Sequence, residues 1–131
     1  MLVQKDTNKI SIVISDDERY LIKQCLNECC HGFRIADFVG TIGASKAVVS
    51  RLLDQLSGAY ESVEAGDDVL QISRIRDDEV RVDLTQEQAR IFINCMNETE
   101  RVLGPDEFPS RFGAKMDEVK QLFSMIEAHL V

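Results

Sequence analysis

Cysteine and histidine are the side chains of this sequence with the most recognisable chemistry, and most of them fall in one short segment. Cys25, Cys29, Cys30 and His31 lie close together, with Cys25 and Cys29 one helical turn apart. Thiolates and imidazoles at such spacing can bind zinc. The fourth cysteine, Cys95, has no such neighbours, and cysteine also packs as a small apolar residue. We therefore expect core packing and no metal site, while the role of Cys29, Cys30 and His31 stays open.

Other catalytic patterns do not emerge from the sequence. His31 and His129 are its only histidines, and neither belongs to a recognisable set of nucleophile, base and orienting residue. There is no glycine-rich loop of the phosphate-binding type, and no paired-carboxylate motif that would raise the pKa of one acid. The sequence therefore predicts a protein that is not an enzyme, with no catalytic residues and no cofactor.

Acidic side chains are the stronger candidates for function. The chain has 131 residues and a formal net charge of −8. Such a charge repels nucleic acids and anionic membranes and attracts basic proteins. Between residues 52 and 73 there is no Lys, Arg or His, and three further acids follow in one turn. We predict that these acids bind the partner: Asp54, Glu61, Glu64, Asp67, Asp68, Asp77, Asp78 and Glu79.

An internal repeat organises the elements that must position these residues. A shift of seventy positions brings Asn27–Glu28 onto Asn97–Glu98 and Gly43–Ala44 onto Gly113–Ala114, and it preserves the apolar pattern. The sequence thus predicts one domain over residues 1–131, built as a tandem duplication of residues 1–61 and 71–131 with a linker at 62–70. Because asparagine is a mediocre helix residue, we expect its side chain to hydrogen-bond the backbone of a nearby turn.

Each predicted unit begins with a β-hairpin. Alternating apolar residues at 9–14 and 79–84 are typical of half-buried strands. Preceding strands at 2–5 and 69–75 would complete two hairpins. We expect the two units to pack about a pseudo-twofold axis, which makes the predicted fold class α+β.

Two helices follow each predicted hairpin. Ser15 and Thr85 begin capping-box patterns, and glycines at 32 and 104 are typical of the helix ends. A short turn that carries Phe38 or Phe108 then leads to the last helix. Its expected buried residues are Val48, Val49, Leu52, Leu53 and Leu56 in the first unit, and Val119, Leu122, Phe123, Ile126 and Leu130 in the second.

Residues 37–53 also resemble a helix-turn-helix, with a glycine turn and a serine cap before the second helix. Binding to DNA requires basic and amide groups on that second helix. Only Lys46 and Arg51 are basic, and the equivalent helix of the second unit carries Asp117 and Glu118. A tight corner between two helices explains the glycine and the cap equally well, so we expect no nucleic-acid partner.

The sequence also bears on where the protein acts. The apolar stretch at 10–14 is too short for a signal peptide, and no run approaches the length of a membrane helix. Without a secretory signal, the cysteines are expected to be reduced thiols. We therefore expect a cytoplasmic protein with no membrane partner.

With these residues in view, the chain resembles the cytosolic immunity proteins of bacterial contact-dependent growth inhibition and related toxin systems. The resemblance lies in its size, its acidity and the acidic run from Asp54 to Asp68. It implies that the chain binds a basic toxin nuclease domain and occludes its active site, with Tyr60 as a desolvated anchor. The alternatives are an adaptor or a self-assembling module, including a possible homodimer, and a helix-turn-helix regulator.

Overall fold

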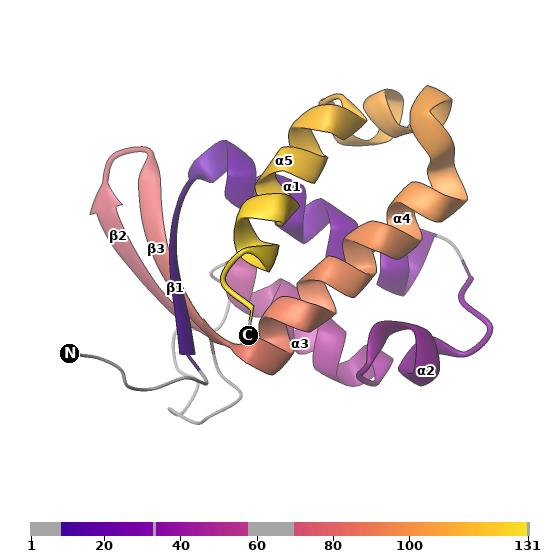
Figure 1. Ribbon diagram of the computed structural model, residues 1–131, viewed down its shortest axis with the longest axis horizontal. Helices are drawn as coiled ribbons and strands as arrows, with labels where there is room; N and C mark the ends of the chain where they lie inside the picture. The colour runs from indigo at the N-terminus through magenta and orange to yellow at the C-terminus, as the bar shows by residue number, and fades with distance from the viewer. Residues whose placement is uncertain (1–8, 33, 58–69, 131) are drawn as a thin grey trace.

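The computed structural model describes residues 9–32, 34–57 and 70–130 (Figure 1). The strand predicted at residues 2–5 and almost all of the linker predicted at 62–70 lie outside these residues. The described elements, in chain order, are β1 (Lys9–Ser15), α1 (Asp16–Asn27), the π-helical turn η1 (Glu28–Gly32), α2 (Phe38–Ile42), α3 (Lys46–Leu56), β2 (Gln71–Arg76), β3 (Glu79–Thr85), α4 (Gln86–Phe112) and α5 (Met116–Glu127).

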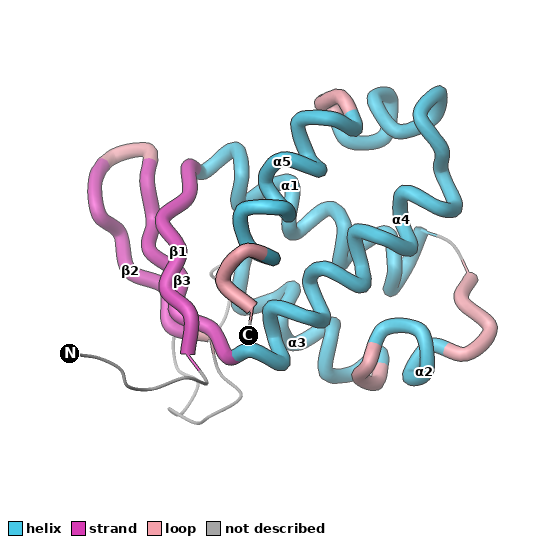
Figure 2. Tube along the Cα trace, in the orientation of Figure 1, coloured by secondary structure: helices cyan, strands magenta, loops and turns pink. Residues whose placement is uncertain are grey.

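The strands form an antiparallel sheet in the order β1-β3-β2, with the helices packed beside it (Figure 2). β1 and β3 pair along their whole lengths, so that Lys9 lies opposite Thr85 and Ile12 opposite Val82. β2 and β3 form the hairpin predicted for the second unit, with an irregularity between Arg74 and Arg76. Helices combined with this antiparallel sheet confirm the predicted α+β class.

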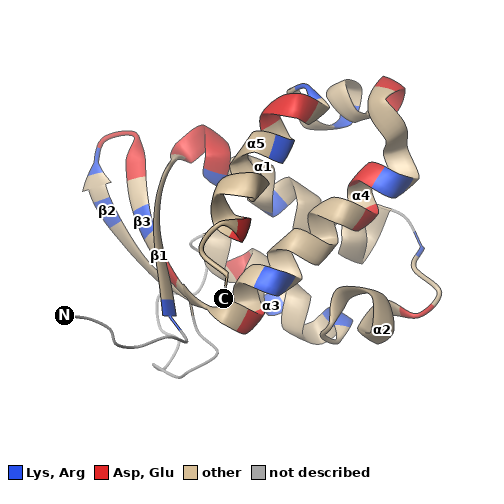
Figure 3. Cartoon of the chain, viewed as in Figure 1, with Lys and Arg blue, Asp and Glu red and all other residues tan. Residues whose placement is uncertain are grey.

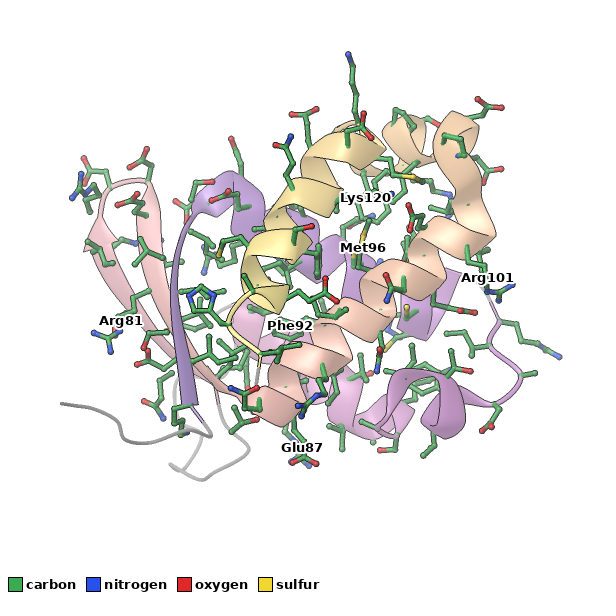
Figure 4. All side chains as sticks on the ribbon, in the orientation of Figure 1. Arg81, Glu87, Phe92, Met96, Arg101 and Lys120 are labelled. Atoms are coloured by element: carbon green, nitrogen blue, oxygen red, sulfur yellow. The ribbon has the colours of Figure 1, made fainter. Side chains whose placement is uncertain are left out.

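The core lies between one face of the sheet and the helices. Alternate residues of β1 and β3 are buried, as the period-two pattern predicts for strands with one covered face. α4 is the central helix and packs against α1 and α5. Its Phe92 and Met96 point into the interior (Figure 4). The most completely buried large side chains include Phe92, Phe108, Ile14, Ile22, Leu26, Ile42, Leu52, Leu56, Leu84 and Ile126.

The predicted starts of the two long helices are confirmed. The amide of Glu18 donates to Ser15 Oγ at 3.0 Å, and the amide of Gln88 donates to Thr85 Oγ1 at 3.0 Å. Both caps are completed by the reciprocal side-chain bond, so each satisfies two backbone amides that the first helical turn leaves without partners. The first helix continues through η1 to Gly32, and the helical backbone of α4 is interrupted at Gly104, where φ is 70°.

Three details of the predicted helices were wrong. Phe38 begins α2, whose start is capped by Asp37, and Phe108 lies in the helical segment of α4 after Gly104, so neither residue is in a turn. The sequence did not indicate helix at these positions, because α2 and the segment of α4 after Gly104 are each too short to show a clear apolar period. Phe108 stacks on Phe112 with ring centroids 4.2 Å apart. Val48 is 37% exposed because it faces away from the core at the start of α3.

Candidate partner-binding site

The predicted partner-binding acids that the structure describes fall in two places. Asp77 and Asp78 form the turn between β2 and β3, and Glu79 begins β3. Asp54 is exposed near the end of α3. The remaining predicted residues, Tyr60, Glu61, Glu64, Asp67 and Asp68, lie outside the described residues.

The β2–β3 turn meets the beginning of α1. The amide of Asp16 donates to the carbonyl oxygen of Asp78 at 3.0 Å. Arg74 links the two segments, because its Nη1 donates to Asp16 Oδ2 at 3.0 Å and to the carbonyl oxygen of Asp77 at 3.1 Å. The hydrogen bond from Arg74 lowers the pKa of Asp16. Acidic residues of both segments are visible together at this end of the molecule (Figure 3).

We call this region the hairpin end and define it by Asp16, Asp17, Asp77, Asp78 and Glu79. Asp17, Asp77 and Asp78 are exposed. Arginines partly neutralise the others, since Arg19 pairs with Asp16 at 3.2 Å and Arg76 with Glu79 at 3.2 Å. The exposed acids therefore have more freedom than the paired ones to bind a basic partner.

Two large apolar residues near the hairpin end are exposed. Tyr20 is 50% exposed and lies on α1, one helical turn after Asp16 and Asp17. Ile75 is 44% exposed, at the irregularity of β2. Aromatic side chains beside charged groups are common anchors in protein interfaces. Sequence reasoning missed Asp16, Asp17 and Tyr20, because the first turn of α1 and the hairpin turn are far apart in the chain.

Asp54 is separated from the hairpin end. The neighbouring Gln55 is fully buried and its Oε1 accepts the amide hydrogen of Leu70 at 3.0 Å. This bond fixes the end of α3 beside the start of β2, whereas the hairpin turn follows the other end of that strand. Six strand residues span roughly 20 Å. The structure therefore does not bring Asp54 together with Asp77, Asp78 and Glu79.

The outer face of the sheet carries a small polar network. Arg81 Nε donates to Asp83 Oδ1 at 3.0 Å, and Arg81 Nη2 donates to Ser11 Oγ at 3.2 Å. Ser11 in turn donates to Asp83. Arg81 points away from the helices (Figure 4), and Val13, opposite it on β1, is 51% exposed. Within this network the charges of Arg81 and Asp83 pair with each other.

A depression between α4 and α5 is lined by Asn97, Glu100, Lys120 and Ser124, among others. Lys120 Nζ lies 3.0 Å from Glu100 Oε2, and this hydrogen bond raises the pKa of Lys120. A lysine that is to act as a base needs a lowered pKa. The contact between Lys120 and Glu100 is therefore best described as an ion pair between α5 and α4.

The segment that resembles a helix-turn-helix forms a corner between α2 and α3. Gly43 adopts a left-handed conformation with φ of 94°, and Ser45 caps α3 through the amide of Val48 at 3.3 Å. Lys46 Nζ lies 5.7 Å from the centre of the Phe38 ring. Asn94 donates from Nδ2 to the carbonyl oxygen of Ile42 at 2.9 Å, which fixes the corner to α4.

The asparagines shared by the two units do not have the predicted role. Within the described residues, the side chains of Asn27 and Asn97 form no hydrogen bond. The adjacent glutamates are the buried polar residues instead, with Glu28 4% and Glu98 8% exposed. Arg111 Nη1 lies 2.5 Å from Glu28 Oε1, and Arg101 Nε donates to Glu98 Oε1 at 3.0 Å.

Across residues 9–32, 34–57 and 70–130, no three Cys, His, Asp or Glu side chains are grouped as metal ligands. No helix in that part of the chain has the length and apolarity needed to cross a membrane. His31, which follows the clustered cysteines, is exposed.

Comparison with known proteins identified no relative of this chain. No family model, no curated protein and no solved structure matches this chain.

Proposed function

We propose that the chain is a duplicated unit folded into an internal dimer. The bounds of β1 and β3 differ by seventy positions at both ends, as do the starts of α1 and α4. The two capping boxes lie at positions seventy apart, Ser15 and Thr85. Gly43 and Gly113 are likewise seventy apart, and both adopt left-handed conformations that end a helix.

The pairing of β1 with β3 supports a pseudo-twofold axis. Ile12 lies directly opposite Val82, its own counterpart at the offset of seventy, and the register is antiparallel on both sides of this pair. Cys29 contacts its counterpart Thr99 in the same way, with Sγ and Oγ1 3.8 Å apart. A residue that contacts its own counterpart lies on the symmetry axis of an isologous interface.

We propose further that the protein binds a basic protein partner and acts as an immunity protein, which neutralises a toxin nuclease domain by occluding its active site. The observation that carries this proposal is the hairpin end, where acids from two distant segments gather beside the exposed Tyr20. Such a surface attracts cationic partners over distance, and a desolvated aromatic residue supplies local affinity. The net charge of −8 reinforces this preference.

Capture and charge reversal test the proposal. The tagged full-length protein is used to capture partners from its native host at low and moderate salt, and captured proteins are identified by mass spectrometry. We expect one small basic domain with nuclease activity, in equal amount and released by salt. The affinity for the captured partner is then measured for two double variants. Asp77→Lys/Asp78→Lys reverses two charges at the hairpin end, and Asp106→Lys/Glu107→Lys is the matched control, which reverses two charges at exposed positions of α4.

The two variants give different expectations. Reversal at the hairpin end is expected to weaken binding at least tenfold and to reduce its salt dependence, whereas reversal on α4 has a much smaller effect because long-range attraction alone is screened over about 8 Å. If both variants weakened the affinity for the partner equally, the hairpin end would not be the binding site. Recovery of the protein alone, with oligomerisation insensitive to salt, would favour a self-assembling module, and recovery of nucleic acid would favour the helix-turn-helix.

A further inference from the structure

Two buried cysteines lie close together where the first half of the chain packs against the second. Cys29 lies in η1 and is 1% exposed, and Cys95 lies in α4 and is 0% exposed. Cys29 Sγ donates to the carbonyl oxygen of Cys95 at 3.5 Å and lies 3.8 Å from Thr99 Oγ1. Cys29 therefore packs directly on the turn of α4 that carries Cys95.

The four cysteines differ in their readiness to react. Hydrogen bonding with Cys95 lowers the pKa of the Cys29 thiol, while contact with Cys29, together with burial, holds the pKa of Cys95 well above its usual range. Burial also raises the pKa of Cys25 and of Cys30. Because the thiolate is the nucleophile in thiol oxidation, the direction of these pKa shifts favours Cys29 over the other three cysteines as the attacking thiol.

The turn that carries Cys29 determines how an oxidant reaches its thiol. Cys29 lies in the π-helical turn at the end of α1, and the described residues 34–37 before α2 are not helical. π-helical turns are rare and less favourable than α-helix. Glu28, Cys29 and Cys30 of this turn are buried, so peroxide reaches Cys29 only when η1 opens locally. We expect this opening to leave α4 folded.

We propose that Cys29 and Cys95 are an oxidation site at which peroxide joins the two halves of the chain by a disulfide. The Cys29 thiolate attacks one oxygen of hydrogen peroxide, the O–O bond breaks, and the departing hydroxide takes up a proton to form water. The sulfenic acid formed on Cys29 is then attacked by the Cys95 sulfur. The S–O bond breaks, the S–S bond forms, and the thiol proton leaves with the hydroxide as a second water. The two thiols are oxidised by two electrons, and the peroxide is reduced to two waters.

The bond would link residues 66 positions apart and hold η1 against α4. A cross-link over such a long loop stabilises the fold chiefly by restricting the unfolded chain. The site is single, because the counterpart of Cys29 in the second half is Thr99. Oxidised protein is therefore expected to unfold at a higher temperature, and dithiothreitol should reverse this shift.

Peptide mapping of the full chain tests the proposal. The protein is treated with hydrogen peroxide, remaining thiols are alkylated, and trypsin is added without a reductant. Cleavage after Lys23, Arg34, Arg90 and Arg101 gives peptide 24–34, which holds three cysteines, and peptide 91–101, which holds Cys95. We expect the two peptides to be joined, with the loss of two hydrogen atoms, and fragmentation to assign the bond to Cys29.

Single variants provide the controls. Cys29→Ala and Cys95→Ala are expected to abolish the cross-link, whereas Cys25→Ala and Cys30→Ala should retain it. Fragmentation of the native protein remains decisive if a variant fails to fold. A cross-link through Cys25 or Cys30, a bond within peptide 24–34, oxygen addition without a cross-link, or four thiols that stay reduced in the folded protein would each overturn the proposal.

Discussion

At the scale of single residues, the two buried glutamates show how equivalent positions have taken different partners. Glu28 pairs with Arg111, which is 83 positions away, while Glu98 pairs with Arg101, only one turn along the same helix. Glu28 also leaves no room for a side chain at position 32, because a Cβ at Gly32 would lie 2.0 Å from Glu28 Oε1. The sequence marked Asn27–Glu28 and Asn97–Glu98 as a matched pair, but it could not show which residue of each pair is buried.

The pair of Glu98 and Arg101 leads to a pH-dependent prediction. The hydrogen bond from Arg101 lowers the pKa of Glu98 below 4.5, the ordinary value of a glutamate. A lowered folded-state pKa stabilises the fold above the unfolded-state value, and that contribution is lost as the pH falls through the folded-state value. Because the Arg101 side chain is 70% exposed and solvent screens the ion pair, we expect Arg101→Ala to lower the free energy of unfolding only slightly at pH 7.

Urea unfolding at pH 7 and pH 3 checks this prediction. The difference in unfolding free energy between native protein and Arg101→Ala should be present at pH 7 and should be smaller at pH 3. In a Glu98→Gln background the same substitution should cost an equal amount at both values. A cost of Arg101→Ala that is unchanged at pH 3 in the native background would mean that the arginine stabilises by packing alone.

At the scale of elements, the sequence predicted the strands and the helix starts, because both depend on local residue patterns. Alternation marked β1 and β3, and the capping residues Ser15 and Thr85 marked the starts of α1 and α4. It placed Phe38 in a turn, because the five residues of α2 show too little periodicity, although the corner expected at Gly43 implied a helix before that glycine. It did not predict η1, because π-helical turns are rare. The contact between the hairpin turn and α1 depends on tertiary packing, which no local pattern records.

The two final helices of the duplication differ in their caps, and this difference predicts a stabilising substitution. Ser45 accepts the amide of Val48 at the start of α3, whereas its counterpart Lys115 makes no side-chain cap at the start of α5. Glu118 Oε1 already accepts the amide of Lys115 at 3.1 Å. Lys115→Ser would complete a capping box, so we expect a gain of about 0.5–1 kcal/mol.

Thermal and urea unfolding measure this gain. Lys115→Ala is the matched control, because it removes the same charge and supplies no hydroxyl. The serine variant should be more stable than the alanine variant by about 1 kcal/mol. Equal stability of the two would show that the start of α5 does not use a side-chain cap.

At the scale of the whole molecule, the antiparallel pairing of β1 with β3 makes the two halves interdependent. Neither half has a complete sheet within the described residues, since β1 pairs only with a strand of the second half. The sequence predicted the strands and the repeat, and a pseudo-twofold arrangement was the simplest expectation. It could not specify the register, because strand pairing is decided by contacts between residues about seventy positions apart.

The proposed axis predicts the result of exchanging the two residues that face each other across it. Ile12 and Val82 are 2% and 0% exposed and lie opposite one another on the covered face of the sheet. Ile12→Val alone should cost about 1 kcal/mol, because it removes one buried methylene. Val82→Ile alone should also destabilise by overpacking.

The double exchange keeps the total volume, and under twofold symmetry each side chain enters an equivalent environment. We therefore expect Ile12→Val/Val82→Ile to unfold within about 0.5 kcal/mol of the native chain, measured by urea at one pH. A double variant as unstable as the sum of the single ones would show that the environments of Ile12 and Val82 are not equivalent, and the internal dimer would lose its main support.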